Sequence, residues 1–226
     1  MNSLYDLSNL IAIGYFLLVW FGHFAWSEHS PASLNSVMEL RRRDWMRRMA
    51  ARENRMPDAI AMQGLQNGSA FFASTTLIAV GGCFAALGAS GEAIEVFSYL
   101  PLGIAMTREV YDVKVLGMAA ILVYAFFKFV WSYRLFNYCS ILVVCTPPRE
   151  EIGMVETAVA IERAARMNIE AGRHFNRGLR GVFFSLAYLG WFASPWALMA
   201  TTTVVTIILH RRQFDSKPLE AASYDG

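Results

Sequence analysis

Long apolar runs alternate along the 226-residue chain with polar segments that are rich in arginine. A helix that crosses a membrane needs about 20 mostly apolar residues to span a hydrocarbon core of about 30 Å. We predict four such transmembrane helices, at about residues 7–26, 69–89, 115–138 and 182–209. The pattern therefore predicts an all-α, polytopic membrane protein, built as a single membrane domain with long cytoplasmic helical extensions.

The fourth apolar run is longer than one bilayer core. It extends without a charge from Gly181 to Leu209, and at a rise of 1.5 Å per residue such a helix is about 43 Å long. Pro195 lies near its middle, where a proline removes one backbone hydrogen bond and bends a helix. We therefore expect the fourth span to tilt, to project from the bilayer or to kink at Pro195.

The third run contains two charged residues, Lys128 and Arg134. A charge at the centre of a span costs roughly 2.5–3.5 kcal/mol on insertion scales, so such residues are candidates for function. Lys128 could extend its stem to the headgroups, act as an ion-pathway or anion-attracting residue, or pair with a buried carboxylate. Arg134 is expected to anchor the helix at the membrane interface.

The second run combines small residues with the hydroxyls of Ser74 and Thr75. Small residues spaced four apart let two helix backbones pack closely, whereas serine and threonine can also line a water-filled path. Both interpretations stay open. The candidate intramembrane residues are therefore Lys128, Arg134, Ser74, Thr75 and Pro195.

Two polar segments, at about residues 33–56 and 150–180, carry apolar residues at helical spacing. This period predicts two cytoplasmic helices. Ser33 is a suitable N-cap for the first, and Pro57 marks the start of a helix that continues into the second span. The first cytoplasmic helix could lie on the membrane surface or pack against the second.

The distribution of arginines orients the predicted spans. The two long polar segments contain thirteen: Arg41, Arg42, Arg43, Arg47, Arg48, Arg52, Arg55, Arg149, Arg163, Arg166, Arg173, Arg177 and Arg180. Because basic loops stay in the cytoplasm, four spans place both termini outside. The C-terminal tail disagrees, since it holds Arg211, Arg212 and Lys217. We predict a multi-pass protein of the plasma (inner) membrane in an N-out/C-out orientation.

Several stretches together resemble one known family. They are Arg43-Asp44-Trp45-Met46, Arg52-Glu53-Asn54-Arg55 with Asp58, Ser69-Ala70-Phe71-Phe72-Ala73-Ser74-Thr75, Phe175-Asn176-Arg177-Gly178-Leu179-Arg180, Gly190-Trp191-Phe192 with Pro195, and Arg211-Arg212-Gln213-Phe214-Asp215-Ser216. Over nearly its whole length the chain resembles DUF599, a family of bacterial and plant membrane proteins of unassigned function. The resemblance implies a multi-span membrane protein and supplies no catalytic residues.

Motifs that would indicate catalysis are missing from the sequence. It holds no nucleophile elbow, phosphate-binding loop or zinc-protease motif, so we predict no enzyme, no catalytic residue and no cofactor. The three cysteines form no C-x-x-C pair and are expected to pack as small apolar residues. His23, Glu28 and His29 could bind a transition metal, but we favour interfacial polar residues and predict no metal site.

We predict a non-enzymatic membrane module that is channel-like or transport-related and oligomeric. The alternative is an accessory subunit that docks a partner through its arginine-rich cytoplasmic helices. The expected partners are the lipid bilayer and either a second copy of the chain or another membrane protein. A net charge of +2 does not favour nucleic acid. The candidate lipid or partner contacts are Arg41, Arg42, Arg43, Arg47 and Arg48.

Overall fold

A computed structural model describes residues 6–99 and 106–224 of the chain. Within these residues all regular secondary structure is helical, apart from one isolated bridge between Ile152 and Met154, which confirms the all-α part of the predicted fold class. The helices are α1 (Leu7–His29), α2 (Leu34–Ala50), α3 (Met56–Gly88), α4 (Ser90–Tyr99), α5 (Arg108–Val144), η1 (Arg149–Glu151), α6 (Val155–Tyr188), α7 (Gly190–Ala193), α8 (Pro195–Phe214) and α9 (Lys217–Ser223).

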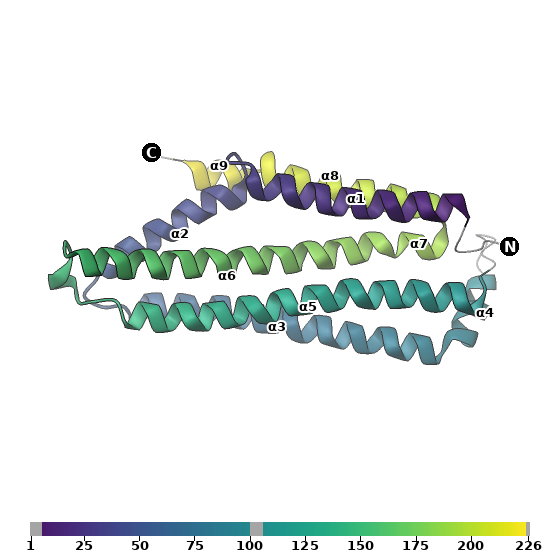
Figure 1. Ribbon diagram of the computed structural model, residues 1–226, viewed down its shortest axis with the longest axis horizontal. Coiled ribbons are helices and arrows are strands. Elements are labelled where there is room, and N and C mark those ends of the chain that lie inside the picture. Colours follow the sequence, from purple (N-terminus) through teal and green to yellow (C-terminus); the bar gives the residue numbers. More distant parts are fainter. Residues whose placement is uncertain (1–5, 100–105, 225–226) are drawn as a thin grey trace.

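The long helices form an elongated bundle. Helix α5 packs between α3 and α6, and α8 packs against both α1 and α6 (Figure 1). Helices α4 and α7 lie at one end of the bundle with the start of α1, while α2, α9 and the α5–α6 connection lie toward the other (Figure 1). We call the latter the arginine-rich end, because it holds both arginine-rich segments.

Three described helices, not the predicted four, are long and apolar enough to cross a membrane. They are α1 over Leu7–Glu28, α3 over Met56–Gly88 and α5 over Arg108–Val144. The prediction of a fourth continuous span at residues 182–209 is wrong. That apolar run is divided among the end of α6, the single turn α7 and the start of α8.

A sharp reversal divides the fourth apolar run. Ser194 is extended (φ −168°, ψ 163°), and its hydroxyl accepts a hydrogen bond from the Ala197 backbone N–H at 3.0 Å, so it caps α8. Pro195 is thus the first residue of α8 rather than a kink within a span. A Cβ on Gly190 would lie 2.7 Å from the Ala197 carbonyl oxygen, so this close approach of α7 to α8 requires a glycine.

The reversal adds one pass along the bundle, so α9 lies at the arginine-rich end (Figure 1). There Arg41 of α2 donates from Nε to the Ala222 carbonyl oxygen of α9 at 2.9 Å. The start of α1 and helix α9 lie toward opposite ends (Figure 1). The arrangement that placed both tails on one side assumed that residues 182–209 form one continuous helix, and the division of that run among α6, α7 and α8 removes this assumption.

Helix α2 packs against α6. Of the two alternatives for the first polar segment, the structure therefore supports packing against the second polar helix. Met46 and Met49 of α2 are fully buried in a cluster with Phe136 of α5 and Ala164 of α6. A second cluster, around Phe16, fills the opposite half of the bundle. The predicted cap is confirmed, since the Ser33 hydroxyl accepts a hydrogen bond from the Ser36 backbone N–H.

The boundaries of the polar helices differ from the prediction. Helix α2 ends at Ala50 rather than near residue 56, and α3 begins at Met56 with Pro57 in its first turn, as expected. Helix α6 continues from the polar segment to Tyr188 without a break. The second polar helix and the first part of the fourth apolar run therefore belong to one helix.

Candidate functional site

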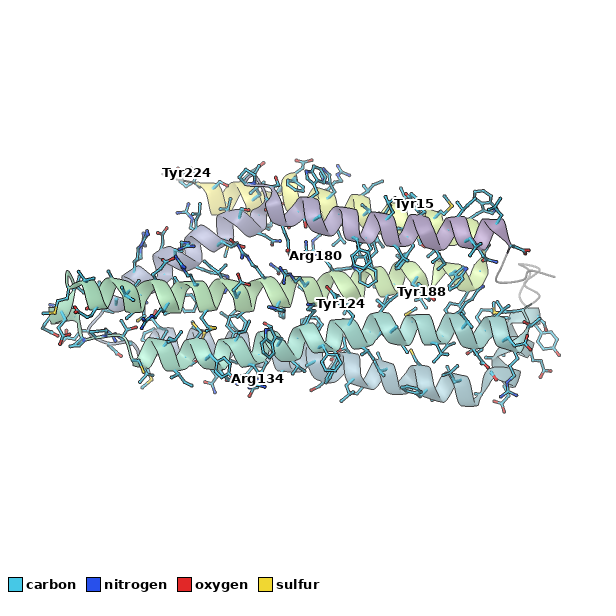
Figure 2. All side chains as sticks on the ribbon, in the orientation of Figure 1. Tyr15, Tyr124, Arg134, Arg180, Tyr188 and Tyr224 are labelled. Carbon is cyan, nitrogen blue, oxygen red and sulfur yellow. The ribbon has the colours of Figure 1, made fainter. Side chains whose placement is uncertain are left out.

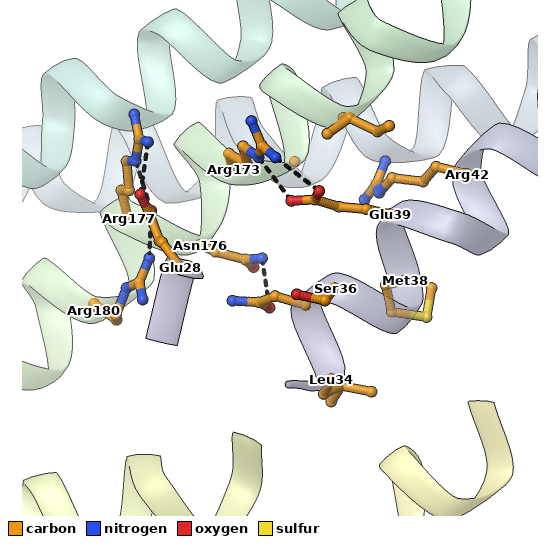
Figure 3. A pocket seen from close by; sticks show the side chains of 13 residues that line it. Glu28, Leu34, Ser36, Met38, Glu39, Arg42, Arg173, Asn176, Arg177 and Arg180 are labelled. Atoms are coloured by element: carbon orange, nitrogen blue, oxygen red, sulfur yellow. Dashed lines mark hydrogen bonds and ion pairs between the residues drawn. The ribbon is translucent and has the colours of Figure 1, made fainter. Parts of the chain in front are cut away.

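One face of α6 carries a row of polar side chains. Arg173, Asn176, Arg177 and Arg180 are separated by three, one and three positions, a spacing that places them on the same side of a helix. This face is turned toward the end of α1 and the start of α2, which supply its partners (Figure 3).

Glu28, in the last turn of α1, pairs with two of these arginines. Its carboxylate accepts from Nε and Nη2 of Arg177, each at 2.8 Å, and from Nη2 of Arg180 at 2.9 Å. Arg180 also donates to the Ser27 hydroxyl, and it lies between α1 and α6 (Figure 2). The hydrogen bonds to Glu28 raise the pKa of Arg177, so this arginine stays charged.

Glu39 of α2 forms the second ion pair. Its two carboxylate oxygens accept from Nε and Nη2 of Arg173 at 2.7 and 2.8 Å, and Glu170 accepts from Nη1 of the same arginine at 2.6 Å. These contacts raise the pKa of Arg173. Between the two ion pairs, Asn176 donates to the Asn35 side-chain oxygen at 2.9 Å.

Arg42 differs from the other arginines of this site. Its guanidinium donates to the Asn168 side-chain oxygen and lies 5.9 Å from the Phe136 ring. Within the described residues no carboxylate oxygen lies within 4.0 Å of it, and burial lowers its pKa. A Cβ on Gly172 would lie 2.9 Å from the Arg42 Cζ atom, so a glycine on α6 lets this guanidinium lie against the helix.

These side chains surround a cavity of about 550 Å³ between α2 and α6, which we call the arginine cavity. Four arginines and two glutamates line it, so its wall carries an excess of positive charge. Guanidinium groups bind carboxylates and phosphates through paired hydrogen bonds. The cavity is therefore suited to an oxyanion. Its charged and amide residues are Glu28, Asn35, Glu39, Arg42, Arg173, Asn176, Arg177 and Arg180.

The predicted intramembrane residues do not line this cavity. Lys128 is half-buried, with its Nζ 5.2 Å from the Tyr124 ring centroid. Arg134 points away from the bundle (Figure 2) and stacks on Trp131 and Tyr138, each at 5.6 Å.

The remaining three candidates lie on other surfaces. Ser74 and Thr75 are exposed on α3, where Thr75 donates to the Phe71 carbonyl oxygen of its own helix. Pro195 opens α8 next to α7, and neither Pro195 nor its neighbours at that turn line the arginine cavity. The structure thus does not bring the five candidate intramembrane residues together.

The α2 arginines have separate roles. Arg42 lines the arginine cavity, Arg41 contacts α9, and Arg43 pairs with Glu162 of α6. Arg47 and Arg48 are exposed.

The predicted histidine–glutamate cluster takes another form. Glu28 is committed to Arg177 and Arg180, and the His29 side chain lies outside the described part of the structure. Among the described residues, no three histidine, cysteine, aspartate or glutamate side chains are placed to hold a metal.

The DUF599 family model, described as "Protein of unknown function", matches residues 11–218. The chain belongs to this family. No curated protein and no solved structure matches it significantly. Of the stretches that carry the DUF599 resemblance, 175–180 lines the arginine cavity with Asn176, Arg177 and Arg180. Gly178, in the same stretch, lets the Phe129 ring contact the α6 backbone, because a Cβ there would lie 2.7 Å from the ring.

Sequence reasoning on this DUF599 chain missed the arginine cavity. It counted Arg173, Arg177 and Arg180 only as evidence of orientation, although their spacing already indicated one polar helix face. Glu39 gave no signal of its own, because its partner Arg173 lies 134 residues away in sequence.

Proposed function

We propose that the protein is an integral membrane protein whose bundle is surrounded by lipid over the half that contains α4 and α7. The three long apolar helices support this, and so do large apolar side chains on the outer surface. Ile78, Phe84 and Trp196 are examples, and Ile78 is 76% exposed. Many large apolar side chains exposed on one molecule are unfavourable in water. In this proposal the hairpin of α6 and α8 completes the membrane bundle.

We further propose that the arginine-rich end faces the cytoplasm of the plasma (inner) membrane. Arg211 and Arg212 lie in the last turn of α8, and Lys217 begins α9, which contacts α2 at that end. In this orientation these basic residues lie in the cytoplasm and agree with the positive-inside rule. In the four-span prediction they lay outside and were an exception to it. The orientation that follows is N-out and C-in.

The function supported best is binding of an oxyanion in the arginine cavity, without catalysis. One observation carries this proposal: four guanidinium groups and two carboxylates line the cavity. The two lining carboxylates and Glu170, which also pairs with Arg173, leave an excess of one positive charge. Phosphate is the natural probe, because guanidinium groups bind its oxygens through paired hydrogen bonds.

Arg42 is expected to contribute most to binding. Arg173, Arg177 and Arg180 already bind carboxylates of the chain, whereas Arg42 holds only neutral partners among the described residues. An anion that replaces neutral acceptors at this partly buried guanidinium gains a charge-assisted hydrogen bond, worth roughly 1.5–3 kcal/mol.

The test is titration of phosphate into the full-length protein in nanodiscs, followed by calorimetry. Arg42→Gln should weaken binding by about tenfold or more. Arg48→Gln removes the same charge from an exposed site on the same helix and should stay within about twofold of the wild type. Absence of phosphate binding by the wild type, or equal losses in both variants, would refute the proposal.

A second candidate function is docking of a membrane partner on the outer face of α2. The exposed Arg47 and Arg48 favour it, since surface arginines contact acidic partners or anionic lipids. A stoichiometric partner, either another protein or a second copy, should then co-purify from native membranes. Recovery of the chain alone would count against docking.

Transport or channel activity stays a separate proposal. The residues that suggested it (Lys128, Ser74, Thr75 and Pro195) lie on different surfaces, so their arrangement offers no added support. Ion flux into liposomes that carry the protein, compared with Lys128→Ala, tests this proposal.

A further inference from the structure

A second cavity, of about 380 Å³, adjoins the arginine cavity and lies between α1, α6 and α8. We call it the histidine cavity, because His23 of α1 lines it. Polar residues of α8 meet it from the other side, among them Gln213 and Arg212. Its apolar wall is formed by Leu34, Leu179, Phe183, Leu209 and Pro218.

His23 is buried without using its hydrogen-bonding groups. Its side chain is only 8% exposed, and neither ring nitrogen has a hydrogen-bond partner in the described structure. The side-chain nitrogen of Gln213 is likewise buried and without a partner there. Buried polar groups are almost always paired, because an unpaired one costs free energy. Two unpaired groups on the wall of one cavity indicate that something polar binds between them.

The two cavities are neighbours. Leu34, Asn35, Asn176 and Arg180 line both. A hydrogen bond joins two of the shared polar residues, from Asn176 to Asn35 at 2.9 Å. A ligand that extends from the arginine cavity toward His23 would pass these shared residues.

The unpaired groups of His23 and Gln213 indicate which chemical group of a ligand would suit the histidine cavity. A neutral imidazole presents one donor and one acceptor, and the Gln213 amide nitrogen presents donors. A hydroxyl group donates and accepts at once, so it satisfies both side chains. A metal ion does not fit, because no third ligating side chain joins His23 among the described residues.

We propose that the histidine cavity binds the hydroxyl-bearing part of a phosphorylated polyol whose phosphate occupies the arginine cavity. This inference rests on the oxyanion site proposed above. The ligand has two chemically equivalent sources, a free polyol phosphate and the glycerol-containing headgroup of an anionic lipid. The pocket lies beside the last turns of the apolar helix α1, a position that either source can occupy.

Calorimetry on the full-length protein in phosphatidylcholine nanodiscs compares glycerol 3-phosphate with inorganic phosphate. We expect glycerol 3-phosphate to bind about tenfold more tightly, the factor expected for one or two net hydrogen bonds. His23→Phe and Gln213→Leu should each remove most of that preference and leave phosphate affinity within about twofold. Gln63→Leu, at an exposed position of α3, is the matched control and should keep the preference.

A lipid arm separates the two sources. If a lipid headgroup is the ligand, the wild type should retain more phosphatidylglycerol from nanodiscs than Gln213→Leu does. The two proteins should retain phosphatidic acid, whose headgroup has no glycerol, to the same extent. If phosphate binds but the glycerol group adds no affinity in either arm, the histidine cavity holds only water and this inference is refuted while the oxyanion site stands. If no phosphate compound binds, both proposals are refuted. Melting temperatures of the variants check that each has folded.

Discussion

Glu28 and Arg177 lie 149 residues apart in sequence and form a two-pronged ion pair, with Nε and Nη2 of the arginine each 2.8 Å from a carboxylate oxygen. The pair joins the last turn of α1 to the middle of α6 (Figure 3). It lies where the apolar part of α1 ends and the polar face of α6 begins. One contact thus fixes the wall of the arginine cavity and the register of α1 on the bundle.

Replacing Glu28 by glutamine should destabilise the fold. The substitution leaves Arg177 and Arg180 without their shared carboxylate, and breaking a fully buried pair costs roughly 3–5 kcal/mol. Because Arg177 is partly exposed, we expect about 2 kcal/mol, or a melting temperature lower by about 4–8 °C. Phosphate should bind more tightly to the folded variant, since the cavity gains net positive charge.

The matched control is Glu53→Gln, which makes the same chemical change at an exposed position. Its melting temperature should stay close to that of the wild type. Equal effects of the two substitutions would contradict the role given to the Glu28–Arg177 pair.

Gly178→Ala should destabilise the contact between α5 and α6. The added methyl group would lie 2.7 Å from the Phe129 ring, and the Phe129 side chain is fully buried. Overpacking of this kind costs about 1–3 kcal/mol. Gly68→Ala on α3 meets no atom within 4 Å, so helix propensity alone should make it neutral or stabilising. Thermal melting of both variants distinguishes close packing from a general effect of alanine.

His174 should make stability depend on pH. Burial, then Lys128 and Arg177, lower its pKa from 6.5 to about 4, and Glu170 and Glu28 oppose this only partly. Because the folded state binds the proton more weakly than the unfolded state, stability is complete above pH 6.5 and falls as the pH drops toward 4.

The measurement is the melting temperature of the wild type and of His174→Gln across that window. The wild type should lose more stability between pH 6.5 and 4 than the variant does. Parallel curves would show that the histidine does not contribute.

Local signals predicted the helix starts well and failed at one turn. Ser33 and Pro57 begin helices as expected, because capping and N1 preferences act within a few residues. Ser194 and Pro195 carry the same signal, an N-cap followed by a proline, but they lie in an apolar run. The uncharged stretch led us to predict a tilted, projecting or kinked span where the chain reverses.

The candidate site was less predictable than the fold. Polarity alone selected Lys128, Arg134, Ser74 and Thr75, since a charge or hydroxyl in an apolar helix is conspicuous. The arginine cavity arises instead from residues in ordinary polar segments. Its partners are brought together by the packing of α2 on α6, which depends on tertiary contacts such as those of Met46 and Met49. No local pattern specifies that packing.

The central claim is a bundle whose arginine-rich end, with both cavities and helix α9, lies on the cytoplasmic side of the membrane. Paired topology reporters test it most directly, with green fluorescent protein or alkaline phosphatase fused after Tyr99 at the end of α4 or after the last residue of the chain. We predict phosphatase activity without fluorescence at Tyr99, and fluorescence without phosphatase activity at the C-terminus. Reporters that place both positions on the same side would contradict the account.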